Sequence, residues 1–169
     1  MKYIATLLAL LVLAASGFAD APPKELEALN HYVGTWSASI TGNTNAKGTS
    51  TTQWTLDNRF VQTSWSRDPD PGVLPKLSGT TLMTYDAAKH VYRGWQFFSN
   101  GGFSSGEGIW DADSRTFTST AKDANNGNTT ITKASFAQDG VESWSIVTTT
   151  SDGKTVNTVS GKNTKQKPK

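Results

Sequence analysis

The chain has 169 residues, and its 16 Lys and Arg residues against 14 Asp and Glu leave it close to neutral. Nucleic-acid-binding domains carry a basic stripe on the folded part, so this balance argues against that class. The chain contains no cysteine, which excludes disulfides, thiolate metal sites and a cysteine nucleophile. Stability therefore has to come from packing within one domain of about 150 residues.

The N-terminus has the pattern of a secretory signal peptide. Lys2 supplies the positive charge, residues 4–15 form an uncharged apolar run, and Ala19 or Ala21 offers a small residue at the cleavage point. The run is shorter than the roughly 20 apolar residues that a membrane-spanning helix needs. We expect residues 1–19 to be removed. Because no cysteine could carry a lipid anchor, we expect the mature protein to be free in the periplasm or secreted, without a membrane anchor.

One short helix is predicted, over residues 22–33. Prolines stand near its first turn, where they are tolerated, and Leu26, Leu29 and Val33 recur at near-helical spacing. We expect this apolar side to lie across an apolar surface of the protein.

Strand-sized runs follow, separated by turn sequences rich in Gly, Asn and Asp. The expected strands lie at residues 34–41, 51–56, 59–66, 115–122, 129–136, 141–150 and 155–160, and the stretch 80–117 contributes a central meander whose hairpin pairs 91–99 with 102–110. Residues 42–48 are predicted to be a loop, and the Pro-rich run 67–79 the longest loop, framing an opening. The basic residues 162–169 are predicted to be a disordered tail, which leaves 22–161 as the domain.

The central hairpin is predicted from Asn100-Gly101, a strong signal for a two-residue turn between strands. That turn pairs Phe98 with Phe103 and places Arg93, Trp95, Phe97, Trp110 and Phe117 on one face. A second turn, at Asp57-Asn58, places Trp54, Leu56, Val61 and Trp65 on one face of its own hairpin.

About ten short strands joined in sequence leave two free edges if the sheet stays open, and closure removes both. The sequence therefore predicts an all-β fold, an antiparallel up-and-down β-barrel of about ten strands with a short N-terminal helix. A two-sheet sandwich is the alternative that the strand spacing also permits.

The motif Gly34-Thr35-Trp36, just after a short helix, resembles the entry motif of the lipocalin and fatty-acid-binding superfamily. Residues 56–62, 85–86, 92–95, and 108–111 with 115–117 resemble, in order and spacing, a bacterial family of secreted, uncharacterised lipocalin-like domains. The resemblance spans most of the mature chain and implies a calycin-type barrel. In many lipocalins an Arg from a late strand covers the motif Trp; here the late strands offer Lys133 and Lys154.

The aromatic residues indicate what such a barrel could hold, because ligand cavities are lined by apolar and aromatic groups with a few convergent polar ones. An inward arginine would bind a carboxylate or phosphate, whereas one at the rim would pack its stem and reach water. We expect a binding protein for a small apolar or amphiphilic molecule, without cofactor or metal, since His31 and His90 are isolated. The predicted cavity lining is Arg93, Trp95, Phe97, Trp110, Phe117, Trp54 and Trp65.

Two other functions stay open. A barrel-type isomerase, cyclase or decarboxylase could use Glu107 with Tyr92, which requires Glu107 to project into a cavity beside an ionisable partner. A solid structural or interaction domain would instead have interior Trp rings in mutual contact and no cavity.

Overall fold

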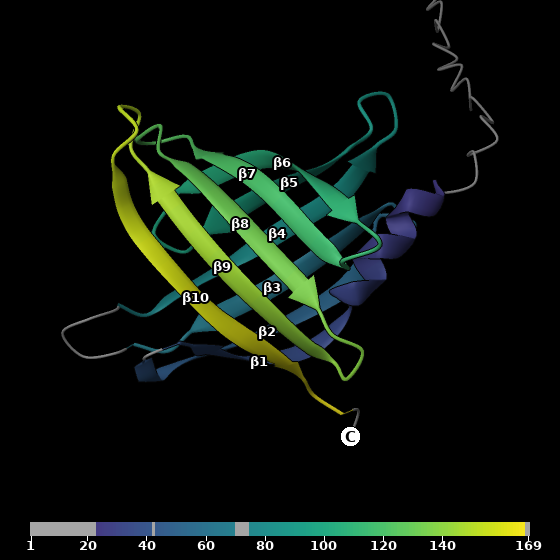
Figure 1. Cartoon of the computed structure of the whole chain (residues 1–169), viewed down its shortest axis with the longest axis horizontal. Helices are drawn as coiled ribbons and strands as arrows, with labels where there is room; N and C mark the ends of the chain where they lie inside the picture. Colours follow the sequence, from purple (N-terminus) through teal and green to yellow (C-terminus); the bar gives the residue numbers. More distant parts are fainter. Residues whose placement is uncertain (1–22, 42, 70–74, 168–169) are drawn as a thin grey trace, which may run out of the picture.

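The computed structural model describes residues 23–41, 43–69 and 75–167. Each strand pairs antiparallel with its neighbours in sequence, and β1 pairs with β10, so the sheet closes into an up-and-down barrel (Figure 1). No helix in these residues is long and apolar enough to cross a bilayer. The elements are η1 (Lys24–His31), β1 (Gly34–Ile40), β2 (Asn43–Thr55), β3 (Phe60–Arg67), β4 (Leu77–Asp86), β5 (Val91–Phe98), β6 (Phe103–Asp111), β7 (Thr116–Asp123), β8 (Thr129–Phe136), β9 (Val141–Thr149) and β10 (Thr155–Lys165).

The prediction of a closed ten-stranded barrel is confirmed, and the sandwich alternative is wrong. Closure occurs where Trp36 of β1 lies opposite Lys165 of β10. Just beyond this pair, the backbone N–H of Gln166 donates to the carbonyl oxygen of Thr35 at 2.8 Å. The backbone N–H and C=O groups that two free sheet edges would expose therefore hydrogen-bond to each other.

Two segments predicted to lie outside the sheet belong to it. Residues 162–165, placed in a disordered tail, continue β10 and pair with β1. Residues 43–48, predicted as a loop, begin β2, and Asp68 N–H donates to the Lys47 carbonyl oxygen at 2.9 Å. Both segments are polar and lack an apolar alternation, so only the backbone pairing of the closed barrel identifies them as strands. The Pro-rich loop lies between β3 and β4, with residues 70–74 outside the described residues, as are residues 1–22 with the expected signal peptide.

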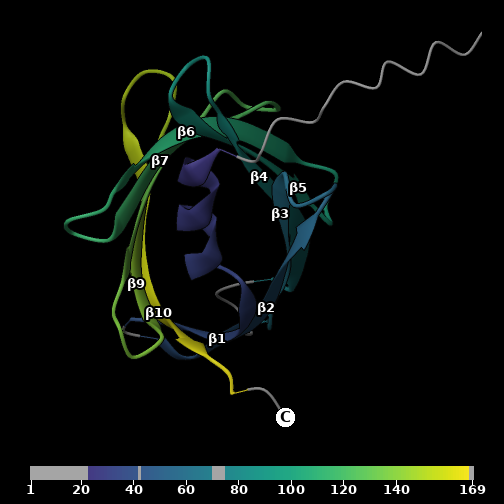
Figure 2. The ribbon, with the colours of Figure 1, turned by 90° about the vertical axis from the view of Figure 1, so that its right-hand side faces the viewer.

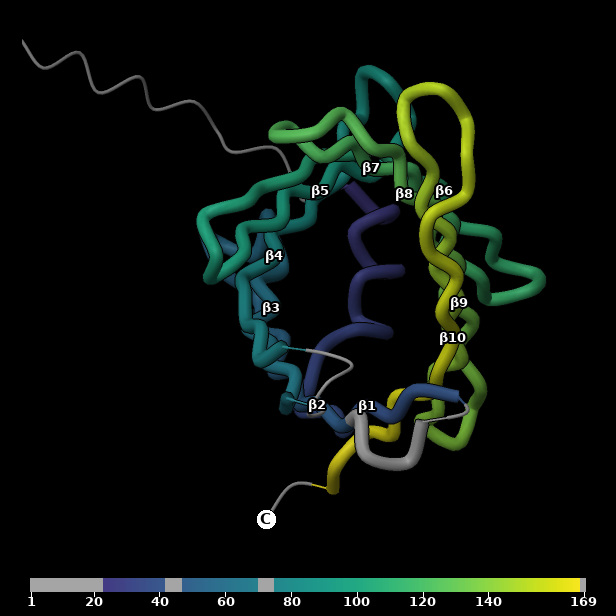
Figure 3. Tube along the Cα trace, turned by 90° about the vertical axis from the view of Figure 1, so that its left-hand side faces the viewer, coloured from purple at the N-terminus to yellow at the C-terminus, as the bar shows by residue number. Residues whose placement is uncertain are grey.

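The helix closes one end of the barrel. It starts directly after Pro23 and is a 3-10 helix, in which residues three apart lie on the same side. Leu26 and Leu29, on that side, are 4% and 0% exposed. Figures 2 and 3 show η1 lying across the ring of strands. The expectation that the helix covers an apolar surface is confirmed.

The core forms between η1 and the strand ends nearest to it. We call this part the closed half of the barrel, and it contains Leu26, Leu29, Trp36, Val61, Tyr92, Phe117, Ala134 and Phe136. The Trp36 indole N–H donates to the carbonyl oxygen of Tyr32 at 2.8 Å, which fixes the chain where η1 leads into β1.

The central hairpin has a register that differs by one residue from the predicted one. Phe98 N–H donates to the Gly102 carbonyl oxygen at 2.9 Å, and Gly101 has φ +85°. The turn is therefore a three-residue loop with glycine in the left-handed region, and it pairs Phe97 with Phe103. A shift of one residue moves side chains to the other face of the sheet.

The hairpin at Asp57-Asn58 follows the prediction more closely. Trp54 pairs with Val61, as expected. Leu56, however, belongs to the turn, with φ +49°, and is 61% exposed, so its predicted place beside Trp54 is wrong.

Candidate functional site

Three inward-facing glycines each lie under an aromatic ring of a nearby strand. A Cβ atom on Gly79 would come within 2.6 Å of the Trp65 indole, and one on Gly108 within 2.8 Å of the Phe117 ring. A Cβ on Gly161 would likewise come within 2.8 Å of Cε2 of Trp144. Because glycine leaves space against the backbone, these rings lie along the wall of the barrel. They therefore line the enclosed space without crossing it.

The half of the barrel away from η1 is lined by inward side chains that stay partly exposed. We call it the open half, and its lining includes Thr63, Trp65, Thr81, Gln96, Phe98, Ser119, Thr132 and Ile146. The register directs these side chains toward the barrel axis. The open half therefore presents aromatic, aliphatic and hydroxyl groups to the barrel interior, and they are only partly buried.

Two buried donors in the open half have no partner among the described residues. They are the indole N–H of Trp65 and the Nε–H of Arg67. The two residues are two positions apart on β3 and therefore share a face. By contrast, the indole N–H of Trp144, which also covers a glycine, donates to the Asn163 side-chain oxygen at 3.1 Å. Buried donors are normally paired, so these two are exceptions on the inner face of β3, although another nitrogen of Arg67, Nη2, donates to the Pro75 carbonyl oxygen at 3.2 Å.

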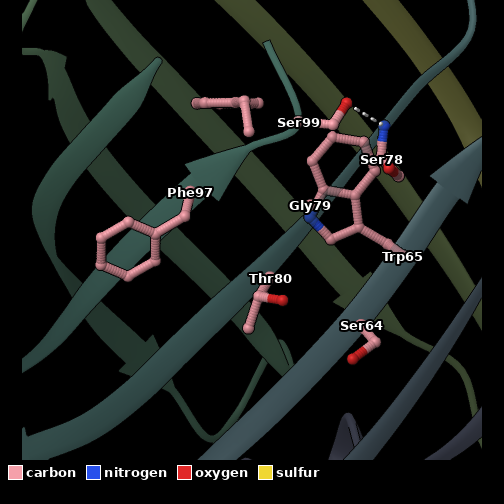
Figure 4. A pocket seen from close by; sticks show the side chains of 8 residues that line it. Ser64, Trp65, Ser78, Gly79, Thr80, Phe97 and Ser99 are labelled. Atoms are coloured by element: carbon pink, nitrogen blue, oxygen red, sulfur yellow. Dashed lines mark hydrogen bonds between the residues drawn. The ribbon is translucent and has the colours of Figure 1, made fainter. Parts of the chain in front are cut away.

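Figure 4 shows the wall at this point, with the Trp65 indole lying over Gly79. On the outer side of the same wall lies a shallow depression of about 420 Å³, bordered by Phe97 and by the hydroxyls of Ser64, Ser78, Thr80 and Ser99. Trp65, Gly79 and Phe98 of the same wall also border this depression.

The seven residues predicted to line a cavity divide between the two faces of the sheet. Trp54, Trp65, Trp110 and Phe117 face inward, as predicted. Arg93, Trp95 and Phe97 face outward, so their predicted place in a cavity is wrong. The cause is the three-residue turn, which pairs Arg93 with Glu107 and not with the inward Gly108.

Arg93, Trp95 and Phe97 have partners on the outer face. Arg93 forms ion pairs with Asp86 at 3.6 Å and Glu107 at 3.9 Å, and its guanidinium lies 5.4 Å from the Trp95 ring centroid. The Phe97 ring stacks on Phe103 at 6.4 Å, and both are more than 40% exposed. These contacts describe an outer surface, where an arginine pairs with carboxylates in water.

The enzyme alternative that uses Glu107 with Tyr92 is contradicted. The Glu107 side chain is 48% exposed on the outer face, where it accepts from Lys89 Nζ at 3.3 Å. Tyr92 is buried on the inner face, and its hydroxyl donates to the carbonyl oxygen of Glu25 at 2.6 Å. Burial raises the pKa of Tyr92 to about 12, so its hydroxyl stays protonated at neutral pH. The two residues cannot act on one substrate from opposite sides of a wall.

The solid-domain alternative required interior Trp rings in mutual contact. Among the described residues, no ring contact joins two Trp side chains. The inward Trp rings pack against Phe, His or glycine backbone, as Trp65 does against Phe98 at 5.9 Å.

Glu142, an inward carboxylate whose pKa is shifted, was not identified from the sequence. Glu142 is 7% exposed in the closed half, and its carboxylate accepts from the Asn163 amide at 2.6 Å. Burial raises the pKa of this carboxyl, while the Asn163 hydrogen bond partly opposes the increase. The alternation of Glu142 with Trp144 and Ile146 along β9 was the available signal, because it places all three on the inner face.

A second pocket, of about 590 Å³, lies between η1 and the strand ends beside it. It brings together His31 and His90, which looked isolated in the sequence. His31 stacks on Trp110 at 4.9 Å between ring centroids, and His90 Nδ1 lies 3.3 Å from the Tyr85 hydroxyl. Burial, with Arg115 and Lys165 nearby, lowers the pKa of His31, so its ring is neutral at pH 7. Among the described residues, no three His, Asp or Glu side chains are placed to hold a metal ion.

The Gly-x-Trp motif also has its basic partner, although not one of the expected lysines. Lys165 of β10 places its Nζ 5.3 Å from the centroid of the Trp36 ring. Lys133 lies on the outer face of β8, and Lys154 precedes β10. The residue that covers Trp36 thus comes from the segment that was predicted to be disordered.

Comparison with known proteins supports the fold. No family model matches the sequence, and a search among curated proteins finds no match. Among solved structures, the chain is similar to the S-type phycobiliprotein lyase CPES from Guillardia theta, at 18% identity and a TM-score of 0.54. The alignment covers 85% of this chain and 93% of that one. At this identity the likeness shows a shared lipocalin-like barrel fold.

Proposed function

We propose that this protein binds a small amphiphilic molecule in the open half of its barrel, as a secreted or periplasmic binding protein. The observation that carries the proposal is the set of inward side chains in the open half that are only partly buried. The signal-peptide pattern of residues 1–19 supports the location. The lipocalin-like fold is compatible with it, since barrels of this size enclose ligands.

The lining determines which part of the ligand lies where. Trp65, Phe98 and Ile146 provide apolar contact, so an alkyl chain or a flat ring system fits against them. The free N–H groups of Trp65 and Arg67 need an acceptor, and a carboxylate or carbonyl oxygen provides one. A medium-chain fatty acid combines both parts.

The test is calorimetric titration of the delipidated protein with dodecanoate. Trp65→Phe keeps an aromatic ring but removes the donor, and we expect about fivefold weaker binding. Arg67→Met keeps the length of the stem and removes the charge, and we expect a loss of about tenfold or more. The matched control is Trp95→Phe, the same substitution on the outer face, which should leave the affinity unchanged.

Two results would contradict the proposal. One is the absence of saturable binding across fatty acids, sterols and flat conjugated carboxylates. The other is an equal loss of affinity from Trp65→Phe and Trp95→Phe, since only the former faces the barrel interior.

A further inference from the structure

The pocket beside η1 is walled by aromatic rings on the barrel side. Tyr85 and Tyr92, on β4 and β5, have ring centroids 5.1 Å apart at an angle of 59°. Trp110 of β6, with His31 stacked on it, forms the next part of the wall. Aromatic rings that border one space attract organic cations, because the π-face of each ring is negative.

The helix side of the same pocket carries carboxylates. Glu25 and Glu27 line it, and neither forms an ion pair with a described residue, whereas Asp86 nearby is paired with Arg93. Lys24 also lines the pocket, so two carboxylates stand there against one lysine. Burial is the main cause of the raised pKa values of Tyr85 and Tyr92, and the negative charge of Glu25, which lines the same pocket, adds to both increases.

The ring positions are held by the fold. The Tyr92 hydroxyl donates to the Glu25 carbonyl oxygen at 2.6 Å, which ties β5 to the first turn of η1. The Tyr85 hydroxyl is paired with His90, so both tyrosine hydroxyls already have partners within the protein. The pocket is therefore formed before any ligand arrives, which lowers the entropic cost of binding.

We propose that this pocket is a second binding site, for an organic ammonium ion held between the aromatic wall of Tyr85, Tyr92 and Trp110 and the carboxylates of Glu25 and Glu27. The volume of about 590 Å³ exceeds that of a simple ammonium group, so the natural ligand carries a further apolar body. The site is separate from the open half, from which the closed-half core divides it.

The test uses choline and its uncharged isostere 3,3-dimethylbutan-1-ol, with the whole protein labelled with ¹⁵N. The Trp110 indole N–H resonance, assigned through Trp110→Phe, reports on the pocket. We expect choline to shift it saturably with a Kd of about 1 mM, and the neutral isostere to bind at least about tenfold more weakly.

Variants separate the aromatic and the ionic contributions. Glu27 is exposed on η1, so Glu27→Gln should leave the fold intact and weaken choline binding about threefold. Tyr85→Leu should weaken it about tenfold, and Tyr85→Phe, which keeps the ring, should match the wild type.

Equal affinity for the two probes, no effect of Glu27→Gln, or a response confined to the Trp65 indole would each overturn the proposal. Trp65→Phe should not alter choline binding, so failure at one site does not imply failure at the other.

Discussion

The closed and open halves of the barrel are built from the same ten strands but differ in what fills them. In the closed half, Leu26 and Leu29 of η1 complete a buried core with Trp36 and Phe136. In the open half, no described element enters the barrel, and inward residues such as Thr63 and Gln96 keep contact with water. The eight residues of η1 therefore determine which end of the barrel has a packed core.

The use of tryptophan N–H groups shows the same difference. In the closed half and at its border, Trp36, Trp54 and Trp144 donate to Tyr32, Asn30 and Asn163. In the open half, Trp65 has no acceptor among the described residues. A packed core satisfies its own polar groups, whereas a binding site can leave them to the ligand.

The largest expected effect is the difference in stability between truncating a side chain in the closed half and truncating one in the open half. Leu29→Ala removes the same number of carbon atoms as Ile146→Ala, but Leu29 is fully buried and Ile146 is not. We expect Leu29→Ala to lower the free energy of unfolding by about 3 kcal/mol, and Ile146→Ala by about 1 kcal/mol. Urea denaturation of both variants measures the difference. Equal losses would show that the open half is packed like a core.

The next effect tests whether the rings lie on the wall. Gly79→Ala places a Cβ against the Phe97 carbonyl oxygen and the Trp65 indole, and we expect a destabilisation of about 2 kcal/mol, with the displaced indole changing the near-ultraviolet circular dichroism spectrum. Gly94→Ala is the matched control, since its Cβ would lie 3.6 Å from Met83 Cγ in ordinary contact. If Gly79→Ala is tolerated as well as Gly94→Ala, the Trp65 ring does not rest on the wall.

A third prediction concerns the buried carboxyl of the closed half. Burial raises the pKa of Glu142 above its ordinary value of 4.5, so the folded state binds a proton more tightly than the unfolded state. The stabilisation from this group is complete below pH 4.5 and is lost as the pH rises through the folded-state pKa. Glu142→Gln should therefore gain in melting temperature relative to the wild type as the pH increases from 4 to 7. A constant difference across this range would contradict the burial effect.

The smallest effect is expected on the outer wall. Glu107→Gln removes ion pairs with Lys89 and Arg93 that are largely exposed and screened by solvent. We expect a change of at most about 0.5 kcal/mol in the free energy of unfolding, and none in dodecanoate affinity. A marked loss of ligand binding would mean that this face takes part in function.

Much of the fold could be predicted from local patterns. The strand at Thr129–Phe136 is bounded by turn sequences on both sides, and its observed limits match the prediction. The helix was recognisable from Pro23 and from the spacing of Leu26 and Leu29. These features depend on nearest neighbours and on short turns, so the sequence alone contains them.

The candidate site was predictable only in part, for reasons of register. Trp65 was placed on the correct face because the turn at Asp57-Asn58 preserved the expected pairing of Trp54 with Val61. Arg67 was missed because it was assigned to the Pro-rich loop, although alternation from Trp65 continues to it. Arg93 was placed on the wrong face because Asn100-Gly101 suits both a two- and a three-residue loop.

By itself, the sequence determined an all-β chain with one covering helix, because alternation, turn residues and capping are local properties. The tertiary structure decided which strand closes the barrel, which face of β5 is inside, and that His31 and His90 meet in one pocket. Each of these depends on pairing between distant segments, and a difference of one residue in that pairing exchanges inside for outside.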